Sequence, residues 1–355
     1  MYPDSVLKNS FVDFVVIGDG EEAFSGLIDY ASSKKKHLEE LDNIGYKDND
    51  RLKYTKRSFF DLEKLPQPAW HLIKVEKYIR KKFYANRVIT INTSRGCPYK
   101  CSFCCVPKVH LGNWRGIRAE KIIENLKYLK EKYLIDGFQV DDDEFDINRE
   151  RVLKLCELLQ KDNLKFKWSH FSRINIVKED VLKTEITCGL RLVEFGIESG
   201  SDRMLIFLNK GQTVEQIINV FNLCRKFKLK VSALFMIGLP TETEDDLTAT
   251  VKLVKRLNPY ITLCTIYRPY PGTELFNYCI NERFFTYDDN LKGVGSIYER
   301  TINTSKIDTN FLLKIKNYFD RRNIYQEIKF IITRLKFNLF MYYLRYYVLK
   351  QARKT

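Results

Sequence analysis

Short apolar runs alternate with longer amphipathic segments through the middle of the chain. Residues 88–93 (VITINT) form a short β-branched run typical of a buried strand, and Ile122, Ile123, Leu126 and Leu129 recur at helical spacing within residues 119–133. The same succession of strand and helix is expected at residues 137–161, 165–186, 191–227 and 230–257, and a sixth strand at 260–267. Strands that alternate with helices of this length predict parallel βαβ crossovers.

The predicted fold is therefore α/β, and six strands in this order suit a partial (β/α)6 barrel, although a doubly wound sheet would give the same pattern. Unusual residues follow four of the strands: a cysteine-rich loop, the acidic run 141–144, Glu198 with Ser199, and Gly238. In parallel α/β folds the working groups follow the carboxyl ends of the strands. We expect these four loops to meet on one face.

The loop after the first strand reads TSRGCPYKCSFCCVP and carries Cys97, Cys101, Cys104 and Cys105. A zinc site usually has a second Cys or His pair, which this sequence lacks, so His110 or Cys105 would have to complete it. Three thiolates on a four-iron cluster instead leave one iron open for a substrate. A non-catalytic zinc protein stays an alternative, but it does not account for the acidic and glycine-rich loops. The other five cysteines lie apart in apolar surroundings and are expected to be small core residues.

The pattern C-x3-C-x-aromatic-C, formed by Cys97, Cys101, Phe103 and Cys104, resembles the cluster loop of the radical S-adenosylmethionine (SAM) enzymes. The resemblance implies a [4Fe-4S] cluster on the three cysteines, with its open iron chelated by SAM. It also implies a low-potential electron donor, whose electron cleaves SAM to a 5′-deoxyadenosyl radical. Phe103 would shield the cluster from water, and Cys105 lies outside the triad.

The resemblance also implies roles for residues in the other loops. Carboxylates of the acidic run would accept hydrogen bonds from the SAM ammonium. Glu198 and Ser199 would bind the ribose or amino-acid part of SAM, and Ile237 and Gly238 would contact its adenine. Arg173 would bind the carboxylate of SAM. The acidic run contributes Asp141, Asp142 and Asp143. Each motif also has a plain structural interpretation: a helix-capping turn, an ordinary buried strand and turn, or an interior ion pair.

Three further segments resemble the branch of this superfamily that carries an N-terminal cobalamin-binding domain: residues 62–73, 196–205 and 268–276. That branch includes anaerobic porphyrin ring-forming enzymes and methyltransferases. Residues 11–24 resemble the last strand, turn and helix of the cobalamin domain, but no histidine stands in its D-x-H-x-x-G motif, which puts cobalamin in doubt. We expect a remnant of that domain at 1–35, a linker at 36–86, the barrel at 87–280 and a helical extension at 281–355, in a shortened homologue or a fragment.

The net charge of +15 suggests an anionic partner, which would be a phosphorylated substrate, a membrane surface or nucleic acid. The leading prediction is an enzyme acting on a small or lipid-like molecule. An RNA-modifying enzyme of the methylthiotransferase type is the alternative, but without an RNA-binding domain or a second cysteine trio, nucleic acid is not the expected partner.

The two ends of the chain bear on its location. The N-terminus MYPDSVLKNS has no secretion signal, so we expect a cytoplasmic protein. Residues 324–355 are apolar, aromatic and basic at once, and cations interrupt every apolar run. This segment predicts either an interfacial helix that makes a peripheral membrane contact or a helix packed along the open side of the barrel.

Overall fold

The computed structural model describes residues 3–32, 37–49, 51–284 and 303–333, the last ten of these as backbone only. Its centre is a six-stranded parallel sheet. The strands are β4 (Val88–Ile91), β7 (Gly137–Val140), β8 (Lys167–Ser172), β9 (Leu190–Glu198), β10 (Lys230–Ile237) and β11 (Ile261–Ile266).

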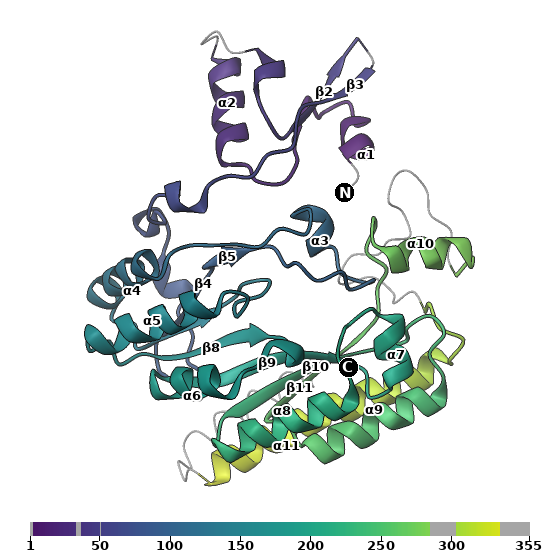
Figure 1. Cartoon of the computed structure of the whole chain (residues 1–355). Coiled ribbons are helices and arrows are strands. Elements are labelled where there is room, and N and C mark those ends of the chain that lie inside the picture. Colours follow the sequence, from purple (N-terminus) through teal and green to yellow (C-terminus); the bar gives the residue numbers. More distant parts are fainter. Residues whose placement is uncertain (1–2, 33–36, 50, 285–302, 334–355) are drawn as a thin grey trace.

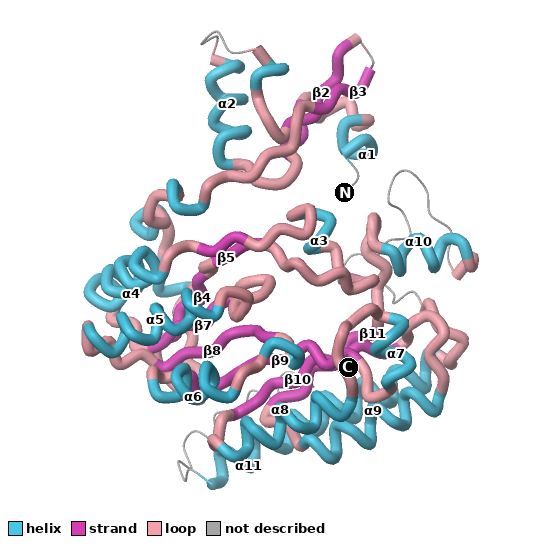
Figure 2. The backbone as a smooth tube through the Cα atoms, in the orientation of Figure 1, coloured by secondary structure: helices cyan, strands magenta, loops and turns pink. Residues whose placement is uncertain are grey.

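The strands stand side by side in the same order in which they follow along the chain. In a doubly wound sheet the order in which strands are added reverses at a switch point, whereas in a barrel every new strand is added on the same side of the preceding one. The sheet is curled, with helices along its outer face (Figures 1 and 2). The structure thus confirms the predicted partial barrel and removes the doubly wound alternative.

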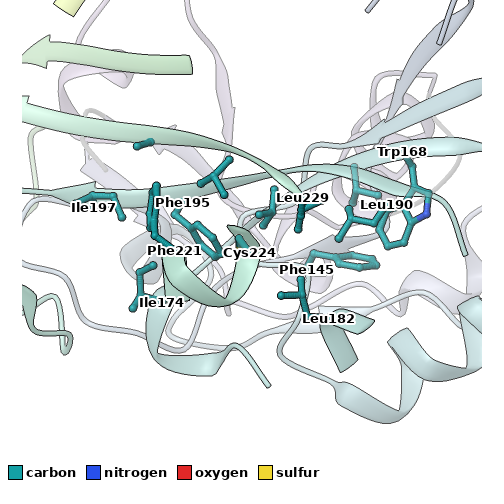
Figure 3. Packing of buried hydrophobic residues seen from close by; sticks show 14 of the residues in the cluster. Phe145, Trp168, Ile174, Leu182, Leu190, Phe195, Ile197, Phe221, Cys224 and Leu229 are labelled. Atoms are coloured by element: carbon teal, nitrogen blue, oxygen red, sulfur yellow. The ribbon is translucent and has the colours of Figure 1, made fainter. Parts of the chain in front are cut away.

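The crossover helices pack on the sheet through the apolar stripes that the sequence predicts. They are α4 (Ala119–Tyr133), α5 (Arg149–Lys161), α6 (Glu179–Thr187), α8 (Val214–Lys226) and α9 (Glu244–Leu257), with α7 (Asp202–Phe207) and the short η5 (Ile174–Ile176) in the loops. Thr213 and Thr243 begin α8 and α9 with capping boxes. Phe145, Trp168, Phe195 and Phe221 lie in the core between the two layers (Figure 3).

Helix α10 (Glu274–Asn281) ends the barrel, and α11 (Thr309–Thr333) belongs to the C-terminal extension. The described part of α11 packs along the edge strand β11, where Arg322 donates a hydrogen bond to the hydroxyl of Thr262 (2.7 Å). Phe319 is buried against Phe235 of β10. The predicted interfacial contact falls on residues 324–355, whose side chains lie outside the described residues. None of the described helices is long and apolar enough to cross a membrane.

A small N-terminal unit stands beside the barrel (Figure 1). It contains α1 (Pro3–Leu7), β1 (Phe14–Val16), α2 (Glu21–Ala31), η1 (Leu38–Glu40), β2 (Ile44–Asp48) and β3 (Arg51–Tyr54). The strand, turn and helix predicted at residues 11–24 correspond to β1 and the start of α2. However, β1 pairs antiparallel with β2, and β2 with β3. Part of the expected linker therefore belongs to this sheet, and a boundary at residue 35 would divide the unit.

The polypeptide between the small sheet and the barrel has only one-turn helices. These are η2 (Leu62–Lys64), η3 (Trp70–Leu72) and η4 (Val75–Lys77). The cysteine loop after β4 adds β5 (Ser94–Arg95), α3 (Val106–Val109) and β6 (Arg115–Gly116). Because β5 and β6 pair antiparallel, the loop leaves the barrel and returns to it at one place.

Candidate active site

The cysteine loop is held in shape by its own backbone. Gly96 has a φ of +88°, and a Cβ atom at this position would lie 1.9 Å from the carbonyl oxygen of Asn113, so only glycine fits. The backbone N–H of Ser102 donates to Leu208 (3.0 Å), and its carbonyl accepts from Leu275 (2.9 Å). The loop is therefore tied to the ends of α7 and α10, on the far side of the barrel opening from β4.

The three predicted cluster ligands lie in this loop, with Cys97 and Cys101 buried and Cys104 partly buried. Burial raises the pKa of Cys97 to about 11 and that of Cys104 to about 12. These thiols hold their protons at neutral pH until a metal replaces them. Phe103 packs at the edge of a small apolar cluster and lies under the ammonium of Lys210, 5.9 Å from the ring centroid.

The cysteines are not grouped around a single ion. Ligands at about 2.3 Å from one zinc ion would lie about 3.8 Å apart. Among the described residues, the one group of three Cys, His or carboxylate side chains whose ligand atoms lie within 4.8 Å of one another is Asp146, His170 and Glu185. His110, the other candidate zinc ligand, faces Asp143 at 3.8 Å. Thiolates on separate corners of a multi-iron cluster stand further apart, so the donor set fits a cluster better than zinc.

Two of the predicted SAM-binding carboxylates anchor the cysteine loop. Buried Asp142 accepts hydrogen bonds from the backbone N–H and hydroxyl of Thr93 (2.5 and 2.6 Å) and from the hydroxyl of Ser94 (2.6 Å). Asp143 accepts one from the backbone N–H of Gly96 (2.8 Å). Asp141 is exposed to solvent. The structure thus gives Asp142 and Asp143 a positioning role that sequence analysis had not assigned to them.

Glu144, the last carboxylate of the acidic run, has the features expected of a ligand-binding group. It is buried, and its Oε1 has no hydrogen-bond partner among the residues that the structure describes. Burial and the charge of Asp146 raise the pKa of Glu144 to about 8, and the charges of Arg173 and Lys210 offset part of the rise. Its charge also acts on the Cys97 thiol. Glu144 therefore lies near the cysteine loop with an oxygen free to accept a hydrogen bond.

Arg173 lies directly against the cysteine loop. Its Nη1 donates to the sulfur of Cys101 (3.2 Å), its Nη2 to the carbonyl oxygen of Lys210, and its guanidinium covers the ring of Tyr99 at 3.9 Å. Arg173 thus joins the cysteine loop to the backbone at Lys210.

Glu198 lies at the end of β9 and forms a buried ion pair with Lys210, with 2.8 Å between Nζ and Oε1. The pairing of β9 with β10 shifts register here, since Gly196 opposes Leu234 and Glu198 opposes the next residue, Phe235. Glu198 also has a left-handed φ of +68°. Such conformations are rare outside glycine and tend to occur at functional sites.

The remaining predicted SAM contacts are engaged elsewhere in the protein. The buried hydroxyl of Ser199 lies 3.3 Å from that of Thr250 in α9 and accepts from the backbone N–H of Ser201 (3.2 Å). Ile237 is fully buried in the main core. The N–H of Gly238 donates to Glu242 (2.6 Å), and a Cβ at Gly238 would meet Leu312 of α11 at 3.0 Å.

Two residues of this site were missed from the sequence, Glu144 as a named ligand and Lys210 altogether. The alternation of strand β7 continues past its end, so that Val140, Asp142 and Glu144 are buried while Asp141 and Asp143 are exposed. That period of two could have singled out Glu144. Nothing local marks Lys210, because its partner lies 12 residues away on another element.

Comparison with known proteins agrees with this geometry. Residues 91–254 match the family model described as the Radical SAM superfamily. This stretch contains the cysteine loop, the acidic run, Arg173 and Glu198. Residues 91–254 thus form a radical SAM domain, a domain of enzymes, and this domain implies a [4Fe-4S] cluster and SAM as cofactors.

Named relatives narrow the comparison. The chain is 35% identical over 271 residues to an uncharacterized methyltransferase of Pyrococcus horikoshii, covering 76% of this chain and 58% of the relative. It is 28% identical over 285 residues to the anaerobic magnesium-protoporphyrin IX monomethyl ester cyclase of Rubrivivax gelatinosus, covering 78% and 50%. The chain thus spans about half the length of these relatives.

A solved structure supports the fold. The radical SAM methyltransferase TsrM from Kitasatospora setae, solved with tryptophan substrate and a SAM analogue, superposes with a TM-score of 0.67 at 15% identity, over 79% of this chain and 56% of that one. TsrM has also been solved with cobalamin and a [4Fe-4S] cluster bound. At this identity the likeness concerns the fold alone.

Proposed function

We propose that this chain holds a [4Fe-4S] cluster through Cys97, Cys101 and Cys104, binds SAM beside it, and catalyses methyl transfer or ring formation on a small molecule. The methyltransferase and cyclase relatives support this reaction class. When bound, the cluster supplies the electron for the reductive cleavage of SAM, and a low-potential donor must replace that electron. The chain's own part is to position the two cofactors and exclude water.

The observation that carries the proposal is the unpartnered, buried Oε1 of Glu144 beside the cysteine loop. An ammonium group has donors only, and a buried carboxylate needs either a donor or a proton. We assign Glu144, rather than Asp141, Asp142 or Asp143, as the acceptor of the SAM ammonium. The approach of the SAM ammonium would favour the ionised form of Glu144, and the attraction would offset the cost of burying both charged groups.

Two cations lie on the same side of the barrel opening. Arg173 contacts Cys101, and Lys210 pairs with Glu198. Their positive charge suits the SAM carboxylate, and Glu198 is the residue we retain for the ribose or amino-acid part. Ser199, Ile237 and Gly238 are left out of the proposed site because their polar groups or side chains are engaged in the helix and core contacts described above.

A hollow between the small N-terminal sheet and α3 offers a place for the substrate. Its volume is about 560 Å³, and its wall includes apolar Val16 and Val109 together with the cations Arg57 and Lys108. It lies next to the helix that directly follows Cys105. Such a wall suits a small amphipathic molecule with an anionic group. No cobalamin site is assigned to the small sheet, because the described residues between 3 and 54 form an antiparallel sheet and not a parallel βαβ unit.

The proposal is tested by measuring 5′-deoxyadenosine and methionine release from SAM after anaerobic reconstitution with iron and sulfide, with dithionite as reductant. The Cys101→Ala variant is expected to lose this release. Cys105→Ala is the matched control, since it changes a neighbouring thiol of the same loop that we leave outside the ligand set. Release by Cys101→Ala at the wild-type rate, or its loss in Cys105→Ala, would contradict the assignment.

A further inference from the structure

A second group of metal-type ligands lies on the helix-covered side of the sheet. Asp146 follows the acidic run, His170 lies on β8, and Glu185 lies on α6. The side chains of His170 and Glu185 are 1% and 2% exposed. Because side chains alternate along a strand, His170 shares the outer side of β8 with Trp168, which packs in the main core against Phe145 (Figure 3).

The hydrogen bonds of His170 fix the state of its ring. Its Nδ1 lies 3.0 Å from the carbonyl oxygen of Phe171, which can only accept, so Nδ1 carries a hydrogen. In the neutral ring Nε2 then presents a lone pair, and it lies 3.4 Å from Oε1 of Glu185. Neither atom has a hydrogen-bond partner within the described part of the chain. Two buried lone pairs that face each other need a cation or a proton between them.

The third member of the group is also incompletely partnered. Oδ2 of Asp146 accepts a hydrogen bond from Ser172 (2.6 Å), whereas its Oδ1, 3.3 Å from Nδ1 of His170, accepts none from the described part of the chain. A cavity of about 30 Å³ adjoins the three side chains, enough for an ion or one water. Two cationic residues also line it, Arg149 and Lys178, and Arg149 is committed to an ion pair with Asp180.

We propose that Asp146, His170 and Glu185 form a binding site for a first-row divalent cation, distinct from the cysteine loop. Metal-binding histidines characteristically donate one ring N–H to a carbonyl and present the other nitrogen to the ion, as His170 does here. One imidazole and two carboxylates suit Zn²⁺, Mn²⁺ or Fe²⁺. The ion would join α6 to β8 and to the end of the acidic run. This site goes beyond the proposed function and does not depend on it.

Zinc binding to the full-length, cluster-loaded protein tests the site, by equilibrium dialysis against Zn²⁺ followed by elemental analysis. Glu185→Gln keeps the side-chain shape but removes the anionic ligand, and is expected to weaken zinc binding at least tenfold. Glu242→Gln is the matched control, because Glu242 is likewise buried with one unpartnered oxygen but lies outside the group. Wild type and Glu242→Gln should each retain about one zinc per chain.

Two further measurements separate this site from the cysteines and from misfolding. Co²⁺ bound in the site should give d–d absorption without thiolate-to-cobalt charge transfer. Zn²⁺ should raise the Tm of the wild type and of Glu242→Gln, but not that of Glu185→Gln, over their values in EDTA. Equal zinc affinity in Glu185→Gln and the control, no zinc in the wild type, or thiolate charge transfer with Co²⁺ would each overturn the proposal.

Discussion

Replacing Asp142 by asparagine distinguishes a residue that builds the loop from one that binds SAM. In the folded protein the carboxylate accepts three hydrogen bonds, two from Thr93 and one from Ser94, and its Oδ2 lies 3.6 Å from Nη2 of Arg151. An amide oxygen in the position of Oδ2 keeps both hydroxyl donors. The amide NH2 in the position of Oδ1 then faces the backbone N–H of Thr93, so two donors oppose each other.

The size of the effect follows from these contacts. A buried N–H left without an acceptor costs about 1–3 kcal/mol. Burial raises the pKa of Asp142 and lowers that of Arg151, so desolvation opposes the charge of both groups. The pair adds little net stability, but removing one partner leaves a buried guanidinium uncompensated, at about 3–5 kcal/mol. We expect a total loss of about 4–8 kcal/mol, which is large beside the 5–15 kcal/mol typical of a folded protein.

The assay is urea unfolding followed by circular dichroism, with Asp141→Asn as the control. Asp141 is the exposed neighbour, and its substitution should change the free energy of unfolding by less than about 0.5 kcal/mol. If Asp142→Asn were as stable as the control, the anchoring role would be refuted. A stable Asp142→Asn protein that failed to bind SAM would instead restore the original expectation that Asp142 accepts the SAM ammonium.

Three more predictions concern single side chains. Glu144→Gln should weaken SAM binding about ten- to hundredfold in calorimetry of the reconstituted protein, because a lost hydrogen bond to a charged group costs about that much affinity. The variant should be as stable as the wild type. Unchanged affinity for SAM would refute the assignment of Glu144. Arg173→Lys should lower the reduction potential of the cluster in EPR-monitored titrations, because a lysine lacks the planar fork that donates to Cys101 and to the carbonyl oxygen of Lys210. An unchanged potential would remove that role. Burial raises the pKa of Glu242 to about 8 from its ordinary 4.5, so the folded state binds this proton more tightly. The stability that this group contributes is present at low pH and is lost as pH rises between those two values. In urea unfolding, the free energy of unfolding of Glu242→Gln should therefore fall by about 2 kcal/mol less than that of the wild type between pH 5 and 7. An identical pH profile in the variant would contradict this prediction.

The barrel was predictable because its signals are local. The stripe Ile122, Ile123, Leu126 and Leu129 is buried in α4 as the helical period requires, and the strands follow their apolar runs closely. The three cysteines could be named because their spacing lies within one loop. Such features depend on neighbours in the sequence, which a periodicity analysis registers directly.

What the sequence did not settle depends on partners from distant elements. Four consecutive carboxylates look alike as a string, yet Asp142 is enclosed by Thr93 and Ser94 of the cysteine loop, while Glu144 keeps an oxygen with no partner among the described residues. Ser199 resembles a ligand in its motif, but Thr250 of α9 meets its hydroxyl. The antiparallel pairing of β1 with β2 likewise joins segments that sequence analysis had placed in a remnant domain and a linker.

The central claim is that Cys97, Cys101 and Cys104 hold a [4Fe-4S] cluster, and the most direct test is iron and acid-labile sulfide per chain after anaerobic reconstitution. Sulfide is decisive because a mononuclear metal site contains none. We predict about four irons and four sulfides in the wild type and the loss of both in Cys97→Ser. Iron without sulfide, or equal amounts of both in the two proteins, would contradict the claim.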